Sequence, residues 1–372
     1  MLNTTLKILE TITNNGYEAY IVGGFVRDYL MNIKSNDVDI TTNATPKELI
    51  NIFPNASCQY AEYGSVVIYF KDTRFEITTY REEENYEDLR HPDTVSYVDD
   101  LKTDLKRRDF LINTICMDKN GKVLDLLNGK CDIDNKLIRT VISPDVSFKR
   151  DALRILRAVR FATTLGFSLS DETILGIKNN KHLLKHLSFN RKKEELNKIF
   201  GSNNIEKGIS LIKELDLVSD LDLKGFENIK SCSQVIGVWA SLDVDTIYPF
   251  TRNEHTLMKN IRLAMKCNLL DMATLYQYGL YVCTTAGELL GIDNKKIVEV
   301  YMKMPIYKRS NIVIDTHDIL DYLKIEEGPI ISEIWKQLEL ALLNGEVNNE
   351  KKQLLLQVMK IYTSLQVTGG IR

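Results

Sequence analysis

The sequence predicts an α+β protein, in which a small mixed β-sheet precedes an elongated all-helical remainder. Short runs of apolar residues suited to strands fill the first third of the chain. From Asp151 onward, apolar residues recur at helical spacing and strand signals nearly vanish. A length of 372 residues exceeds one ordinary hydrophobic core, so we expect two or more domains.

The expected strands all lie in the first third of the chain. They cover residues 19–22, 37–41, 65–70, 74–80 and 114–118, with helices near the N-terminus, over 25–30 and over 46–53. Later helices are expected over 151–165, 189–200, 205–215, 255–266, 269–286, 295–303, 316–323, 331–344 and 351–366. Pro144 and Gly201 mark plausible breaks between groups of helices.

Composition narrows the possible locations and partners. The formal charge of −3 gives no general nucleic-acid signature, so a polyanion would have to bind a local basic surface. No apolar run approaches the length of a bilayer span, and the N-terminus has an amphipathic helical pattern, so we expect no membrane partner. Six scattered cysteines without a C-x-x-C pair indicate reduced thiols and a cytoplasmic protein.

A turn of two glycines between a strand and a helix is the first chemical motif. The apolar run ending at Val22 predicts a strand, and Gly23 and Gly24 form the turn before a helix. Such a turn lets backbone N–H groups approach a phosphate. Arg27 lies one turn into the helix and can donate two hydrogen bonds to a phosphate.

A pair of aspartates follows this turn. If Asp37 and Asp39 lie on one strand, their carboxylates project from the same face. Neighbouring carboxylates suit Mg²⁺, and two such ions can hold the attacking and leaving oxygens of a phosphoryl transfer. The glycine turn and the acidic pair together predict nucleotidyl transfer. Glu76, on a later strand, is either a third catalytic carboxylate or an outward-facing surface residue.

Two arginine-rich segments follow. Residues 106–113 carry a basic cluster that continues into an apolar run, so at least one arginine is expected to point inward. Arg108 could contact a triphosphate or a base, while Asp109 and Asn113 could fix that arginine or touch a ribose.

The second segment, residues 151–161, has arginines at every third position. Asp151 and Arg154 would be neighbours on a helix, either as a surface ion pair or as a donor and acceptor that read a base edge. Arg157 and Arg160 could hold phosphates or orient that pair. Arginines at this spacing wind around a helix, so they cannot all belong to one solvated stripe.

These motifs, in this order, resemble the bacterial class II CCA-adding enzymes, which are tRNA nucleotidyltransferases of the wider poly(A)-polymerase-like family. The matching segments are residues 23–28, 37–39, 107–113, 151–161 and 191–198. The segment 318–349 also resembles the tail of the Bacillus-type members.

The resemblance implies a catalytic head (1–140), a base-recognition neck (141–200), a body (201–270) and a tRNA-binding tail (271–372). Asp37 and Asp39 would bind Mg²⁺, and CTP or ATP would be bound by Gly24, Arg27, Arg108, Asp151, Arg154, Arg157 and Arg160. The partner would be the acceptor arm and 3′ end of tRNA, held by helices rich in Lys and Arg such as residues 190–198. The expected assembly is a monomer or a homodimer.

The segment 80–105 resembles the flexible loop of enzymes that add the final A as well as both Cs, which favours full CCA addition. Two residues depart from the family pattern, because Arg150 stands where Glu is usual and Leu111 where Thr is common. His317 and Asp318 resemble a metal-binding dipeptide of some relatives, but we interpret them as the start of a helix.

Alternatives remain open at this point. An A-only adding enzyme or a poly(A) polymerase would share the same catalytic motifs. A small-molecule nucleotidyltransferase would share the acidic pair but would hardly need so many further helical residues. A catalytically inactive RNA-binding protein is the alternative of a different class.

Overall fold

The computed structural model describes residues 1–35, 37–57, 61, 64–70, 73–84 and 94–367. The chain divides into two compact units, of which unit 1 contains residues 1–223 and 247–249, and unit 2 contains residues 224–246 and 250–372. The finer division into head, neck, body and tail stays a prediction.

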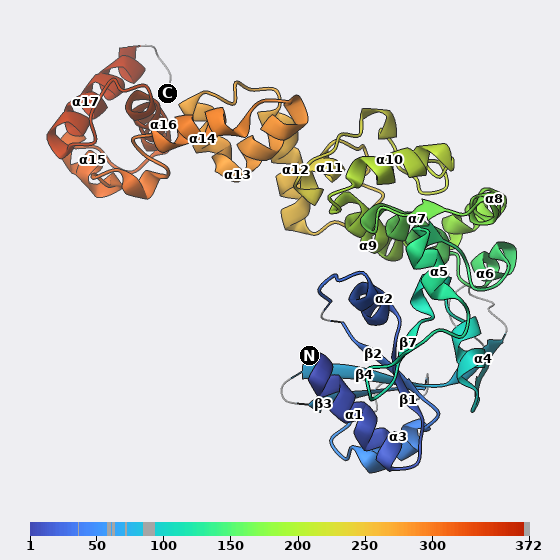
Figure 1. The fold of residues 1–372 in the computed structure, drawn as a ribbon. Coiled ribbons are helices and arrows are strands. Elements are labelled where there is room, and N and C mark those ends of the chain that lie inside the picture. Colours follow the sequence, from blue (N-terminus) through green and yellow to red (C-terminus); the bar gives the residue numbers. More distant parts are fainter. Residues whose placement is uncertain (36, 58–60, 62–63, 71–72, 85–93, 368–372) are drawn as a thin grey trace. The chain divides into compact units, whose positions relative to one another are not determined.

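Unit 1 begins with a mixed sheet of six strands in the order β3-β4-β2-β1-β7-β8 (Figure 1). Its strands are β1 (Ala19–Val22), β2 (Asp39–Thr42), β3 (Ser65–Phe70), β4 (Thr73–Thr79), β7 (Cys116–Met117) and β8 (Val123–Leu124). Strands β2 and β4 run parallel, whereas the other neighbouring strands are antiparallel. The expected mixed sheet is therefore confirmed.

The two faces of this sheet have different coverings. The first face packs on α1 (Leu2–Asn14) and α3 (Pro46–Ile52), through a core that includes Ile8, Ile40 and Ile77. Because side chains alternate along a strand, Asp39 and Glu76 belong to the opposite face, which also carries Val22. On that second face, Val22 packs with Leu101 and Leu105 of α4 (Leu101–Lys106).

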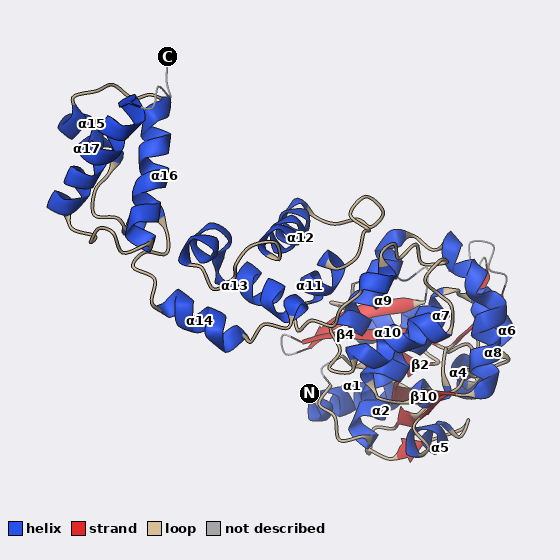
Figure 2. Ribbon diagram, turned by 90° about the horizontal axis from the view of Figure 1, so that it is seen from above, coloured by secondary structure: helices blue, strands red, loops and turns tan. Residues whose placement is uncertain are grey.

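Helices and short strands complete unit 1 (Figure 2). They are α2 (Gly24–Leu30), β5 (Arg81–Glu84), β6 (Thr94–Tyr97), η2 (Leu111–Asn113), α5 (Gly129–Asp134), β9 (Leu137–Ile138), α6 (Pro144–Arg150), α7 (Leu153–Thr164), β10 (Ser168–Leu169), α8 (Asp171–Asn180), η3 (Lys181–His186), α9 (Phe189–Phe200) and α10 (Ile205–Glu214). The hairpin β5–β6 and the short parallel pair β9–β10 were not predicted.

In the described part of unit 2, every regular element is a helix. These are η4 (Phe226–Asn228), α11 (Val235–Ala240), α12 (Arg252–Ala264), α13 (Met272–Leu290), α14 (Asn294–Met302), η5 (Arg309–Asn311), α15 (Thr316–Leu323), α16 (Pro329–Leu343) and α17 (Lys351–Val367). Helix α13 contains a kink at Gly279, whose φ of 78° lies in a region that favours glycine. Among the described residues, no helix has both the length and the apolar character needed to cross a bilayer.

Three predicted boundaries were wrong in ways that matter. Strand β2 begins at Asp39, so Asp37 precedes it and the same-face argument for a strand does not apply to that pair. Helix α7 begins at Leu153, because Asp151 has an extended backbone and its Oδ1 accepts a hydrogen bond from Leu153 N at 3.0 Å. Helix α13 begins at Met272 instead of Leu269, because Asp271 caps its N-terminus.

Two smaller predictions concern cysteines and a histidine. The five described cysteines are free, as expected, although Cys131 and Cys267 are exposed. His317 lies in the first turn of α15, where Asp315 and Asp318 form a capping box. The interpretation of His317 and Asp318 as a helix start is therefore confirmed.

Candidate active site

The glycine turn faces the carboxylate of Asp39. Gly23 has a φ of 81° at the start of α2, and a Cβ there would lie 3.3 Å from Asp39 Oδ2 and 3.6 Å from Arg108 Nη1. Glycine is therefore required both by the backbone conformation and by the lack of room. Since α2 spans only Gly24–Leu30, its dipole is small. An anion would therefore be bound mainly by the backbone amides of the turn.

Three carboxylates belong to this edge of the sheet. Asp39 pairs directly with Glu76 across the parallel strands β2 and β4, which places both side chains on one face. Asp37 is exposed immediately before β2. Glu76 also accepts a hydrogen bond from Arg74 Nη2 at 3.3 Å, in a pair that is largely exposed.

The electrostatics of Asp39 fit a cation. Its carboxyl keeps solvent access, yet surrounding protein atoms desolvate it and raise its pKa. Arg108 opposes that rise, whereas the charges of Asp37 and Glu76 add to it. Hard carboxylate oxygens that repel one another are suited to a divalent cation such as Mg²⁺. Among the described residues, no group of three or more His, Cys, Asp or Glu side chains is placed so that it could hold a metal ion.

Arg108 points toward the glycine turn and Asp39. Its Nη1 is the atom beside Gly23, its Nη2 lies 3.6 Å from Asp104 Oδ2, and its buried Nε has no hydrogen-bond partner in the described part of the chain. A buried donor without a partner is costly, so a ligand that accepts from this guanidinium would remove the penalty. The expectation that an arginine of residues 106–108 points inward is confirmed.

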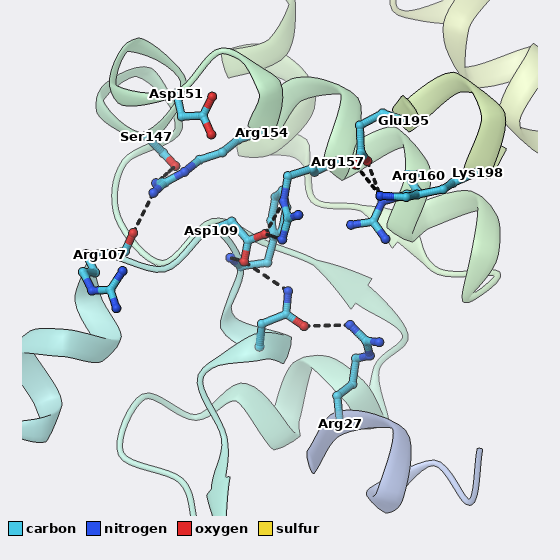
Figure 3. A network of polar contacts seen from close by, with 12 residues as sticks. Arg27, Arg107, Asp109, Ser147, Asp151, Arg154, Arg157, Arg160, Glu195 and Lys198 are labelled. Atoms are coloured by element: carbon cyan, nitrogen blue, oxygen red, sulfur yellow. Dashed lines mark hydrogen bonds and ion pairs between the residues drawn. The ribbon is translucent and has the colours of Figure 1, made fainter. Parts of the chain in front are cut away.

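A chain of buried and part-buried hydrogen bonds links α2 to α7 (Figure 3). Arg27 Nη1 donates to Asn113 Oδ1 at 2.7 Å, Asn113 Nδ2 donates to Asp109 Oδ1 at 3.1 Å, and Arg157 Nε donates to Asp109 Oδ2 at 2.8 Å. Burial alone would raise the pKa of Asp109, but the charge of Arg157 and the hydrogen bond from Asn113 hold it well below its usual range. Asp109 and Asn113 therefore fix two arginines.

Two arginines of α7 and one of α2 converge on one aromatic ring. The guanidinium carbons of Arg27, Arg157 and Arg160 lie 5.1, 5.4 and 4.0 Å from the centre of the Phe161 ring, within the range of cation–π contacts. Arg160 also forms an ion pair of 2.6 Å with the buried Glu195 of α9. The expectation that these arginines do not form one solvated stripe is confirmed.

Asp151 and Arg154 do not form an ion pair in the described structure. Arg154 is buried, and its guanidinium donates to Ser147 Oγ at 2.9 Å and to the Arg107 carbonyl at 2.6 Å. Asp151 instead lies near Arg191 of α9, at 3.4 Å. Figure 3 shows the Asp151 carboxylate and the Arg154 guanidinium directed apart. Both remain beside the site, but each is held by other partners.

The lysines of α9 already have partners within unit 1. Lys192 is fully buried and lies over the Phe189 ring at 4.5 Å, and Lys193 donates to the Pro249 carbonyl at 3.0 Å. Lys198 is exposed but lies 3.0 Å from Glu195. These contacts brace unit 1, so α9 offers less free charge to a polyanion than its sequence indicates.

Three family models match successive parts of the chain. The poly A polymerase head domain matches residues 19–139, the RNA- and SrmB-binding site of polymerase A matches residues 166–221, and tRNA nucleotidyltransferase domain 2 matches residues 249–358. A CCA-adding enzyme of Ligilactobacillus salivarius is 32% identical over 96% of both chains. Another, from a Geobacillus strain, is 34% identical over 94% of both chains.

This chain belongs to the CCA-adding enzyme family. A solved structure agrees, because the Bacillus stearothermophilus CCA-adding enzyme in complex with CTP matches 99% of both chains with a TM-score of 0.87 and 27% identity.

Sequence reasoning missed two acidic residues of this family member. Glu195 was noted only within a motif, and Asp104 was not noted at all. Asp104 stands three and four residues before Arg107 and Arg108, a spacing that places an acid beside both arginines on a helix. That spacing could have identified it.

Proposed function

We propose that this chain is a template-independent nucleotidyltransferase that extends the 3′ end of tRNA with C, C and A, using CTP and ATP and releasing pyrophosphate. The observation that carries the proposal is the position of Asp39 Oδ2, which lies 3.3 Å from where a Cβ of Gly23 would be, with Arg108 beside it. A phosphate over the turn would meet the carboxylates and Arg108 together. Relatives that share nearly the full length of the chain are named CCA-adding enzymes.

In this proposal, Asp37 and Asp39 hold Mg²⁺, and substrate phosphates and water complete its coordination. Bound Mg²⁺ would lower the pKa of the tRNA 3′ hydroxyl and stabilise the charge on the leaving pyrophosphate. Gly23, Gly24, Arg27 and Arg108 contact the triphosphate. Arg27 belongs to α2, and its Nη2 lies 3.6 Å from where a Cβ of Gly24 would be. Rate enhancement then comes mainly from positioning and charge stabilisation.

Base selection is proposed for Asp151 and Arg154. Leu153 N and Arg191 both donate to Asp151 Oδ1, and we assign Oδ2 to a base amino group. Cytosine and adenine both carry such an amino group, whereas uracil does not. Arg157 and Arg160, which are held by Asp109 and Glu195, would contact phosphates or orient Asp151 and Arg154.

Glu76 lies beside Asp39 in the sheet, which is the position that a third catalytic carboxylate would need. Its exposure and its pairing with Arg74 are equally typical of a surface residue, so both roles stay open. The segment 80–105, which favours full CCA addition, includes residues 85–93, which lie outside the described residues. Full CCA addition therefore rests on the family relationship and is the point to test.

The test is a gel assay with labelled tRNA that lacks its terminal CCA. With Mg²⁺, we expect two additions with CTP alone and three with CTP and ATP together. Long A tracts would indicate a poly(A) polymerase, and a single A added only to tRNA that already ends in CC would indicate an A-only enzyme. No incorporation, with tRNA binding retained, would indicate an RNA-binding protein.

A further inference from the structure

A fully buried carboxylate stands behind the proposed triphosphate site. Asp104 lies in α4 with no exposed surface. Its Oδ1 accepts from Arg107 Nε at 2.8 Å and from the backbone N of Arg81 at 3.3 Å, and its Oδ2 accepts from Thr41 Oγ1 at 3.2 Å. Arg108 Nη2 lies 3.6 Å from the same Oδ2.

The contacts of Asp104 come from three separate parts of the head. Thr41 belongs to β2, two residues after Asp39, and Arg81 N begins β5, where the chain leaves the sheet after β4. Arg107 and Arg108 follow α4. Asp104 thus joins the strand that bears Asp39 to the arginine that faces the glycine turn.

Asp104 has the charge state that this role needs. Burial would raise the pKa of its carboxyl, but the charges of Arg107 and Arg108 outweigh burial and lower the pKa. The carboxylate is therefore a fixed negative charge at the pH of the reaction. It holds one end of the Arg108 guanidinium, while Nη1 at the other end lies beside Gly23 and Asp39.

We propose that Asp104 is the positioning residue that aims Arg108 at the triphosphate, through an ion pair fixed to β2 by Thr41. The proposal rests on the proposed function, because it assumes that Arg108 binds the triphosphate. Without the Asp104 charge, Arg108 loses its only ion-pair partner in the described part of the chain and can rotate away from Gly23.

The test is Asp104→Asn, which keeps the shape of the side chain and removes its charge. We expect the KM for CTP to rise about tenfold, the effect of losing one charge-assisted contact, with a smaller change in kcat per active enzyme. The KM for tRNA should stay unchanged. A merely structural role would lower the fraction of active enzyme and leave the KM for CTP as in the wild type.

The matched control is Asp132→Asn. Asp132 is likewise fully buried and paired with an arginine, Arg139, but it lies in α5 and was not assigned to the site. We expect this variant to lose thermal stability without a change in the KM for CTP. An equal rise in both variants would overturn the proposal, because it would show a general effect of losing a buried charge.

A double variant tests whether Asp104 acts through Arg108. Arg108→Ala alone should raise the KM for CTP, and adding Asp104→Asn should raise it less than about threefold further. Independent, multiplying effects, or a wild-type KM in Asp104→Asn, would overturn the proposal. Calorimetric titration of CTP into the free enzyme measures the same shift without turnover. A wild type that binds CTP but incorporates nothing would reject the proposed function. The role of Asp104 would then be tested by the calorimetric titration alone.

Discussion

The edge of the sheet that carries Asp37, Asp39 and Glu76 differs from helix α7 in how its charged side chains are paired. At the edge, Asp37, Asp39 and Glu76 have like charges, and their mutual repulsion contributes to the raised pKa of Asp39. On α7, Arg157 and Arg160 each have a buried acidic partner, Asp109 and Glu195 respectively. Compensation at the edge is only partial, from Arg108 beside Asp39 and from the largely exposed Arg74 beside Glu76, whereas each of the two arginines has a buried acid.

This difference separates a region prepared for a ligand from one prepared to hold its shape. Charges that repel gain most when a cation arrives, because its binding removes the repulsion. Charges that are already paired in a buried network make the structure more rigid. The fold loses stability if one partner is removed. Substitutions at the edge should therefore affect chemistry, and substitutions in the network should affect stability.

The largest expected effect comes from the edge. Asp39→Ala should reduce nucleotide incorporation by at least about a thousandfold, because a metal ligand supplies several kcal/mol of transition-state stabilisation. Melting temperature and tRNA binding should remain close to those of the wild type, as they should in the surface control Asp171→Ala, which should also keep its activity. Substantial turnover by Asp39→Ala would refute the metal assignment.

Substitutions among the paired charges of α7 should instead reduce the stability of the fold. Asp109→Ala leaves Arg157 without its buried partner, and we expect a loss of roughly 3 kcal/mol of unfolding free energy, the low end for a buried pair, since 33% of the Arg157 side chain is exposed. Chemical denaturation measures this loss. In unit 2, Asp245→Ala removes a more exposed pair with Arg262 and should cost about 1 kcal/mol.

The pH dependence of that loss has a defined sign. Because the folded protein lowers the pKa of Asp109, this carboxyl stabilises the fold at pH values above its unfolded pKa. That contribution disappears as the pH falls through the folded pKa. The stability difference between the wild type and Asp109→Ala should therefore shrink in acid, and a difference that grows would contradict the network.

The sequence predicted the glycine turn and its strand better than it predicted the ion pairs of α7, for a physical reason. The turn at Gly23 and the strand before it follow local rules of backbone conformation, so the motif could be placed without a structure. The pairing of Asp109 with Arg157 joins residues 48 positions apart, and that of Thr41 with Asp104 joins residues 63 apart. No local pattern specifies such partners.

Local rules also failed where the chain departs from ideal elements. The spacing of Asp151 and Arg154 predicts helical neighbours, but the backbone at Asp151 is extended and breaks the helical register. The Lys- and Arg-rich residues 190–198 were expected to hold tRNA, yet Lys192 is buried over Phe189. Charge identity is visible in a sequence, whereas the direction in which a charged side chain points depends on tertiary packing.

A smaller effect should separate base selection from catalysis. Asp151→Ala should relax the choice among the four nucleoside triphosphates by about tenfold, because one base-edge contact is lost. Competition assays with CTP, ATP, UTP and GTP measure this choice. Asp145→Ala, on the neighbouring helix α6, is the matched control and should keep wild-type selectivity. Unchanged selectivity in Asp151→Ala would remove this residue from the base site.

The smallest expected effect is a shift in the pH profile of kcat/KM, and it decides the role of Glu76. If Glu76 acts only as a neighbouring charge, Glu76→Gln removes one cause of the raised pKa of Asp39. The pKa of Asp39 then falls, so more of it is ionised in mild acid, and the acid limb of the kcat/KM profile should move to lower pH. Arg74→Gln should move the limb the other way, because it frees the charge of Glu76. A third catalytic carboxylate would give a different result, with a loss of about a hundredfold or more at every pH in Glu76→Gln, since general-base catalysis contributes that much.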